Sequence, residues 1–214
     1  MLGESKLNAV RRFESLERKL EKNPEIRLQY NAFMEQYISL GHMQAVQDTS
    51  NNVRTVFYPP HHPVYKQSSS TTKLRVVFDG SAKTSSGRSL NDVLMVGPVF
   101  QDELLEIILR FRKHPVALVA DIEKMYRQVL VSEEDRCLQR ILWRFDPTQP
   151  LFTYALNTVT YGFSPSSFLA TRTLRQIAFD EASEYPLGSK AILKDFYVDD
   201  FIGGENSAAR TIQL

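Results

Sequence analysis

Apolar residues recur at helical spacing along the N-terminal part of the chain. Positions 7, 10, 13, 16 and 20 are apolar and predict one amphipathic helix. Asn23 and Pro24 then supply an N-cap and a first-turn proline for a second helix, which we expect to end at Gly41. The pattern therefore predicts a helical lead-in over residues 1–45.

The second segment, residues 46–115, has the pattern of strands and loops before one helix. Residues 53–58 predict a strand that a Pro-Pro pair interrupts, and residues 74–78 predict another, with a polar loop over residues 67–72 between them. Residues 102–113 predict a helix. Its expected inward residues are Leu104, Leu105, Ile108 and Phe111.

The third segment, residues 116–214, opens with a continuous apolar run. Residues 116–120 predict a strand buried on both faces, and Asp121 follows at its end. Three further elements come in this order: a strand pair at residues 137–145 and 151–159, a helix that Ser164 and Pro165 begin, and a strand pair around Asp199 and Asp200. This order predicts an α+β fold in which an antiparallel sheet carries helices on one face.

Composition narrows the class of protein. The chain is 43% hydrophobic and 24% charged, which is typical of a soluble globular protein. A single cysteine, Cys137, excludes an internal disulfide framework and a cysteine-rich zinc site. We therefore expect an intracellular setting, cytoplasmic or nuclear. No signal peptide or membrane-length apolar run is present, so we expect no membrane partner.

Basic residues are concentrated between positions 51 and 90. This stretch carries one acid, Asp79, and six bases: Arg54, Lys66, Lys73, Arg75, Lys83 and Arg88. Contact with nucleic-acid phosphates is one interpretation of such a basic stretch. An ordinary solvated surface is the other.

Two adjacent carboxylates, Asp199 and Asp200, lie between apolar residues. Clustered carboxylates repel one another unless a hard cation lies between them, so the pair suggests a divalent-metal site. Asp also favours turns, which leaves a purely structural hairpin as the alternative. If Asp121 lies beside this turn in the sheet, three carboxylates are available, which is what a pair of Mg²⁺ ions needs to hold a triphosphate.

Several motifs together resemble those of reverse transcriptases. DIEKMY from Asp121, YGF from Tyr161 and YVDD from Tyr197 occur in the order and rough spacing of the polymerase motifs, and LRVVFD from Leu74 resembles the fingers motif. The chain is most similar to BEL/Pao retrotransposons, through YPPHHPVYK from Tyr58, KLRVVFDGSAK from Lys73 and SLND from Ser89. The resemblance covers essentially the whole chain. It implies a right-hand polymerase, with fingers over residues 46–115 and palm over residues 116–214.

The resemblance also implies an activity and a set of site residues. The activity is that of an RNA-directed DNA polymerase using Mg²⁺ or Mn²⁺, with Asp121 and Asp199 as principal metal ligands and Asp200 completing the cluster. The remaining implied residues contact the dNTP or template: Lys66, with Lys73 as its rival, and Arg75 at the phosphates, Tyr126 at the sugar, and Tyr161 and Gly162 beside the incoming nucleotide.

The implied partners are a primed RNA or DNA template, a dNTP and the rest of a Pol polyprotein. The chain continues for fourteen residues beyond Asp200. We therefore expect the thumb, RNase H and integrase to lie outside it, and little activity from the chain alone. Two alternatives stay open: a noncatalytic nucleic-acid-binding remnant or host-retained protein, and a template-independent nucleotidyltransferase.

Overall fold

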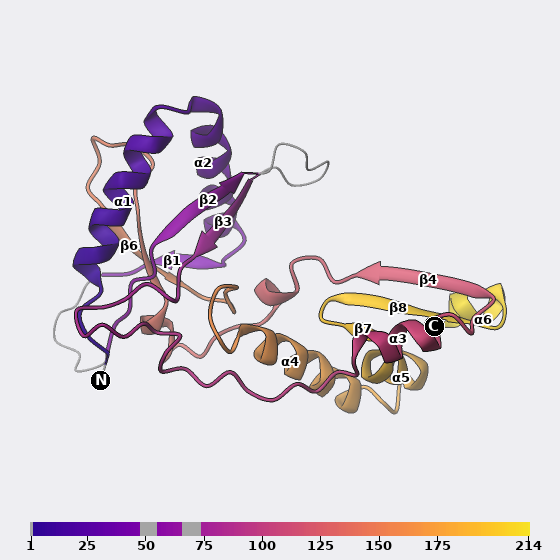
Figure 1. The fold of residues 1–214 in the computed structure, drawn as a ribbon. Helices are drawn as coiled ribbons and strands as arrows, with labels where there is room; N and C mark the ends of the chain where they lie inside the picture. Colours follow the sequence, from indigo (N-terminus) through magenta and orange to yellow (C-terminus); the bar gives the residue numbers. More distant parts are fainter. Residues whose placement is uncertain (1, 48–54, 66–73) are drawn as a thin grey trace. The chain divides into compact units, whose positions relative to one another are not determined.

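A computed structural model describes residues 2–47, 55–65 and 74–214 (Figure 1). The described residues form six α-helices and eight β-strands, and the strands pair antiparallel. Helices and antiparallel sheets together agree with the predicted α+β class. The chain divides into two compact units: unit 1 contains Met1–Met95 and Leu130–Ser164, and unit 2 contains Val96–Val129 and Pro165–Leu214. The functional division into lead-in, fingers and palm stays a prediction.

The two helices predicted at the N-terminus are confirmed in unit 1. Helix α1 spans Lys6–Glu21 and buries its apolar stripe, including Phe13 and Leu16. Helix α2 spans Pro24–Ser39, with the proline in its first turn, and the chain leaves it through Gly41 at a φ of 70°. Glycine adopts that left-handed conformation without a steric penalty, which explains why the helix ends there.

Unit 1 contains two small sheets. Strands β2 (His61–Tyr65) and β3 (Leu74–Phe78) pair with each other, and a second sheet has the order β1 (Met43–Ala45), β6 (Phe152–Leu156) and β5 (Arg140–Trp143). The strand pair predicted at residues 137–145 and 151–159 corresponds to β5 and β6. Residues 136–138 form a 3₁₀ turn, η2 (Arg136–Leu138), so the first strand is shorter than predicted. Strand β1 was not predicted, because three residues are too few to show the alternation of apolar and polar positions that marks a strand.

The prediction of a strand at residues 53–58 is wrong over its described part. Residues 55–58 lie outside any strand, and the strand instead begins at His61, after the Pro-Pro pair. Its partner decides the position, because β3 pairs residue by residue with His61–Tyr65 and not with the residues before the prolines. Residues 53 and 54 and the predicted loop at 67–72 lie outside the described residues.

The core of unit 1 is built on aromatic side chains. Trp143 stacks on Tyr30, with ring centroids 5.1 Å apart, and meets the edge of Phe13 at 5.8 Å. His61 lies beside them, accepting a hydrogen bond from Tyr30 Oη at Nδ1 (2.5 Å) and donating one from Nε2 to the carbonyl of Leu142 (2.9 Å). Burial lowers the pKa of His61 to about 4, so the imidazole is neutral at pH 7.

Unit 2 is built around a three-stranded sheet with the order β4 (Val116–Asp121), β8 (Asp200–Glu205) and β7 (Phe196–Tyr197). Helices α3 (Leu104–Phe111) and α5 (Pro186–Lys194) contact β7 and β8, and α4 (Ser166–Asp180) packs against α5. A short helix, α6 (Ala208–Gln213), follows β8. Helices α5 and α6 were not anticipated from the sequence, although Pro186 at the start of α5 is a usual helix-start signal.

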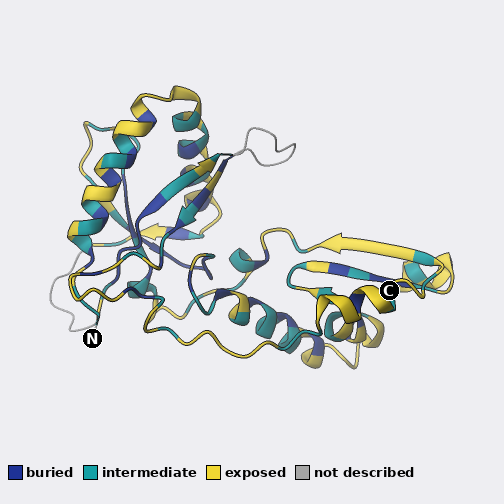
Figure 2. Ribbon diagram, in the orientation of Figure 1, coloured by how far each residue is buried: buried dark blue, intermediate teal, exposed yellow. Residues whose placement is uncertain are grey.

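Two burial predictions for unit 2 are wrong. Strand β4 was expected to be buried on both faces, but Val119 is 63% exposed and residues 117–121 are all exposed (Figure 2). Apart from its pairing partner β8, the main contact of β4 among the described elements is the short helix α6, so little covers either face of the strand. In α3, Ile107 is fully buried, whereas the predicted inward residues Leu104, Leu105 and Ile108 are exposed. The side of α3 that faces β8 is therefore not the side that the apolar pattern predicted.

No described helix has the length and apolar character that crossing a membrane requires.

Candidate functional site

Asp121 and Asp200 are direct partners in the β4–β8 ladder of unit 2. The amide of Ile122 donates to the carbonyl of Asp199 (3.0 Å), which makes Asp121 and Asp200 a non-hydrogen-bonded pair. In such a pair the Cα atoms are about 4.5 Å apart and both side chains leave the same face of the sheet. The expected proximity of Asp121 to the Asp199-Asp200 turn is therefore found.

Asp199 lies in the two-residue turn that joins β7 to β8. The turn consists of Val198 and Asp199, between the paired residues Tyr197 and Asp200. Val198 has a φ of 56°, a left-handed conformation that is a true outlier for a β-branched residue. The side chain of Gln101 binds both polar backbone groups of Val198, so the strained turn is held from outside the hairpin.

The three carboxylates have the chemical features of a metal site but are not assembled as one. Within the described residues, the structure records no hydrogen bond or ion pair to the side chains of Asp121, Asp199 or Asp200. Asp121 and Asp200 are exposed, and hard divalent cations prefer such carboxylate oxygens. In the described part of the chain, no three acidic, His or Cys side chains already form a metal-binding group. The residue types therefore fit Mg²⁺ or Mn²⁺, although the three side chains are not preassembled around such an ion.

Tyr126 lies close to the acidic residues in sequence and is fixed by helix α4. It belongs to the 3₁₀ turn η1 (Met125–Gln128), which follows Lys124 in a left-handed conformation (φ 53°). The hydroxyl of Tyr126 is 3.0 Å from Oγ of Ser167, in the first turn of α4. The ring also packs beside a small apolar cluster centred on Met125 and Leu174. A ring held in this way keeps a defined orientation.

Tyr161 and Gly162 belong to unit 1 and lie against the end of β3. The hydroxyl of Tyr161 donates to the carbonyl of Val76 (2.6 Å). Gly162 has a φ of 100°, and a Cβ atom added to it would lie 2.2 Å from the carbonyl oxygen of Phe78. Only glycine fits this position, since both the backbone conformation and the space exclude a side chain.

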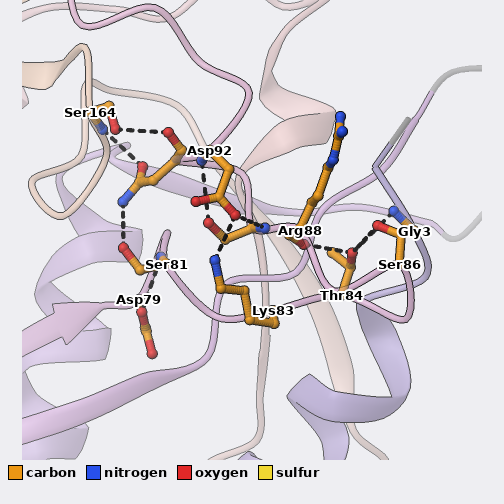
Figure 3. A network of polar contacts seen from close by, with 11 residues as sticks. Gly3, Asp79, Ser81, Lys83, Thr84, Ser86, Arg88, Asp92 and Ser164 are labelled. Carbon is orange, nitrogen blue, oxygen red and sulfur yellow. Dashed lines mark hydrogen bonds and ion pairs between the residues drawn. The ribbon is translucent and has the colours of Figure 1, made fainter.

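A polar network connects the loop after β3 to the Gly162 turn, as Figure 3 shows around Ser81 and Ser164. The side chain of Asn91 donates to Ser81 Oγ and to the carbonyl of Gly162 (2.9 Å each), and accepts from the amide of Ser164. Next to it, Asp92 accepts hydrogen bonds from Lys83 and Ser89, and these lower the pKa of Asp92 to about 2. The network gives the glycine-containing turn a fixed shape.

The basic residues of the predicted phosphate-binding stretch are only partly described. Arg75 is exposed on β3, opposite Val64. Lys83 pairs with Asp92 at 2.6 Å, and Asp79 lies 3.7 Å from Arg12. Lys66, Lys73 and Arg54 lie outside the described residues. Arg75, Tyr161 and Gly162 belong to unit 1, whereas Tyr126 and the three aspartates belong to unit 2.

Comparison with known proteins adds no family to this description. No model of a protein family matches the chain, and no curated protein is significantly similar to it. The resemblance to reverse transcriptases therefore rests on the motifs themselves.

Three residues with structural roles at these sites were not anticipated: Gln101 at the aspartate turn, Ser167 at Tyr126 and Asn91 at Gly162. Asn91 lies within the SLND motif and Ser167 directly follows the helix start, so both had a weak local signal. Gln101 had none, because a single amide in a loop gives no pattern and its partner is 97 residues away.

Proposed function

We propose that this chain is the fingers and palm part of an RNA-directed DNA polymerase of the BEL/Pao type, which adds nucleotides from dNTPs to a primer 3′ end. The observation that carries the proposal is the pairing of Asp121 with Asp200, next to Asp199 in the turn. Three acidic residues from two distant motifs meet at one end of one sheet. The motif that contains Asp121 and the motif that contains Asp199 and Asp200 are far apart in the sequence, and neither one alone predicts that these residues pair.

The proposed roles follow from the chemistry of each side chain. A divalent ion, Mg²⁺ or Mn²⁺, would supply the Lewis acid that stabilises charge on the transferring phosphate. Asp121, Asp199 and Asp200 would hold it through their carboxylate oxygens. Tyr126, fixed by Ser167, would restrict the sugar at its 2′ position. Arg75 would contact phosphate through its fork of N–H donors, with Lys66 or Lys73 as a mobile cation.

A second candidate function is nucleic-acid binding without catalysis. It is favoured by the finding that the described acidic side chains do not already form a metal-binding group. In that case the hairpin would be a structural turn, and only the exposed bases such as Arg75 would contact nucleic acid.

The test is primer extension on a primed RNA template with Mg²⁺ or Mn²⁺, by a polypeptide in which this chain continues through a thumb domain. We expect dNTP incorporation that Asp199→Asn lowers by about 10² to 10³-fold or more, because one ligand charge is lost. Glu184→Gln, which removes an exposed acid in the turn after α4, is the matched control and should leave the rate unchanged. If Asp199→Asn leaves the rate of dNTP incorporation unchanged, the activity does not come from this site and the polymerase proposal is wrong.

A further inference from the structure

The side chain of Gln101 binds the turn of the β7–β8 hairpin as a peptide group would. Its Oε1 accepts from the amide of Val198 at 2.8 Å, and its Nε2 donates to the carbonyl of Val198 at 3.3 Å. A carboxamide is the side-chain group that offers a donor and an acceptor side by side, so both polar groups of one residue are satisfied at once.

The residue bound in this way is the strained one. A left-handed conformation is unfavourable for a β-branched residue and persists only where surrounding contacts enforce it. The next carbonyl, that of Asp199, is bound by the amide of Ile122 at 3.0 Å. Gln101 on one side and Ile122 on the other therefore determine the backbone of Val198 and Asp199.

Gln101 is itself anchored to the base of the hairpin. Its neighbour Asp102 pairs with Arg110 of helix α3 at 3.0 Å and with Lys194 at 3.5 Å. Arg110 also contacts Asp195, directly before β7, at 3.4 Å. These contacts join the segment that carries Gln101 to Lys194 and Asp195, directly before β7. The backbone of Gln101 is therefore held in place relative to the hairpin.

We propose that Gln101 is a positioning residue, which holds the Val198-Asp199 turn in its strained conformation and thereby fixes the backbone position of Asp199 next to the Asp121–Asp200 pair. The inference rests on the proposed metal-dependent function for its consequence, but the hydrogen bonds to Val198 can be tested without it. It assigns a role to a residue that no sequence motif indicated. Supporting residues of this kind commonly change metal affinity by about 10–100-fold when they are replaced.

The test uses the 214-residue chain in two measurements, hydrogen exchange of the Val198 amide by NMR and Mn²⁺ binding by electron paramagnetic resonance. Gln101→Met keeps the length of the side chain and removes both hydrogen bonds. We expect Val198 exchange to accelerate and the half-saturating Mn²⁺ concentration to rise, each about tenfold or more. Gln176→Met, at a partly exposed position of α4, is the matched control and should change neither.

A second variant distinguishes a role of Gln101 in holding the strained turn from a role in the general stability of the unit. Val198→Gly relieves the strain, since glycine adopts positive φ freely. In that background Gln101→Met should raise the half-saturating Mn²⁺ concentration much less than in the original chain. If Gln101→Met does not fold, Gln101→Glu replaces it, because a carboxylate keeps the acceptor for the Val198 amide but loses the donor.

The outcomes distinguish this inference from the proposed function. Unchanged exchange at Val198 in Gln101→Met would overturn the binding of the turn by Gln101. Faster exchange with unaltered Mn²⁺ binding, in a chain where Asp199→Asn does lose Mn²⁺, would overturn the positioning role and leave the metal site intact. Absence of Mn²⁺ binding by the unaltered chain would overturn the metal-dependent function and the positioning role together.

Discussion

Asp121 faces Asp200 across the β4–β8 ladder as a non-hydrogen-bonded pair, and both carboxylates leave the same face of the sheet. Like charges that lie directly opposite on neighbouring strands destabilise a sheet. The hairpin therefore carries an electrostatic cost that a bound cation would relieve. This relationship can be examined without any assumption about nucleic acid.

Asp121→Asn should stabilise the chain when no divalent ion is present. Removing one of two facing charges is expected to raise the free energy of unfolding by about 0.2–1 kcal/mol. In the unaltered chain, Mn²⁺ at ten times its dissociation constant should add about 1.4 kcal/mol, and most of this gain should disappear in Asp121→Asn. Urea unfolding with and without Mn²⁺ measures both effects. Glu184→Gln should behave as the unaltered chain, and equal Mn²⁺ stabilisation in all three proteins would contradict the site.

Ser167→Ala should loosen the orientation of Tyr126, because it removes the hydroxyl 3.0 Å from the tyrosine oxygen. In the polymerase polypeptide that continues through a thumb, we expect greater use of ribonucleotides relative to dNTPs, with a smaller change than in Tyr126→Ala. The ratio of kcat/KM for the two nucleotide types is the measurement. Thr173→Ala on the same helix, whose hydroxyl binds only within α4, is the control. An unchanged ratio in Tyr126→Ala would remove the sugar-selecting role.

Gly162→Ala should destabilise the chain more than Gly41→Ala. Both glycines have positive φ, so alanine costs about 1–2 kcal/mol of backbone strain at either position. At Gly162 the new Cβ would also meet the carbonyl oxygen of Phe78 at 2.2 Å, whereas nothing lies within 4 Å at Gly41. Overpacking of this kind adds about 1–3 kcal/mol. Denaturant unfolding of the two variants compares them, and equal losses would show that the close approach to Phe78 is not present.

His61 should make the stability of the chain depend on pH between about 4 and 6.5. Its pKa is lowered to about 4 by burial, whereas an unfolded histidine titrates near 6.5, so the unfolded state binds the proton more readily in this window. Stability should rise with pH through the window, and about 3 kcal/mol should be lost as the pH falls from 6.5 to 4.

The difference between the unaltered chain and His61→Gln isolates this effect from the carboxylates that titrate in the same range. An NMR titration of the His61 ring gives the pKa directly if the variant does not fold. A measured pKa near 6.5 would contradict the buried, neutral imidazole.

Arg75→Ala should weaken binding to a primer–template duplex and reduce its dependence on salt. Each lost phosphate contact lowers the slope of log affinity against log salt by roughly 0.7 to 0.9. Binding should be measured at several salt concentrations. Arg18→Ala, which removes an exposed arginine from α1, is the control. A slope that is unchanged by Arg75→Ala would mean that this side chain faces solvent in the complex.

The local elements of this protein were predictable because their patterns depend on near neighbours in the chain. The apolar period and the Pro24 and Gly41 signals predicted α1 and α2, and two apolar runs around a turn predicted the hairpin that carries Asp199. Candidate chemistry was equally local, since two adjacent aspartates in an apolar frame are conspicuous in the sequence alone. The boundaries near prolines were less accurate, as the position of β2 shows.

By contrast, contacts between residues distant in the sequence decided how the strands pair, which side chains are buried and which residues hold the aspartate turn. The continuous apolar run of β4 suits burial on both faces, but burial depends on the elements that pack on the faces of the sheet, and little packs on β4. The pattern of α3 did not reveal that Ile107 would be its buried residue, because the opposing surface of β8 selects the face. The sequence by itself determined which residues can bind a cation or adopt a turn. Only the tertiary structure decided that Asp121 meets Asp200 and that Gln101 holds Val198, since both depend on the free energy of the whole packed unit and not on local propensity.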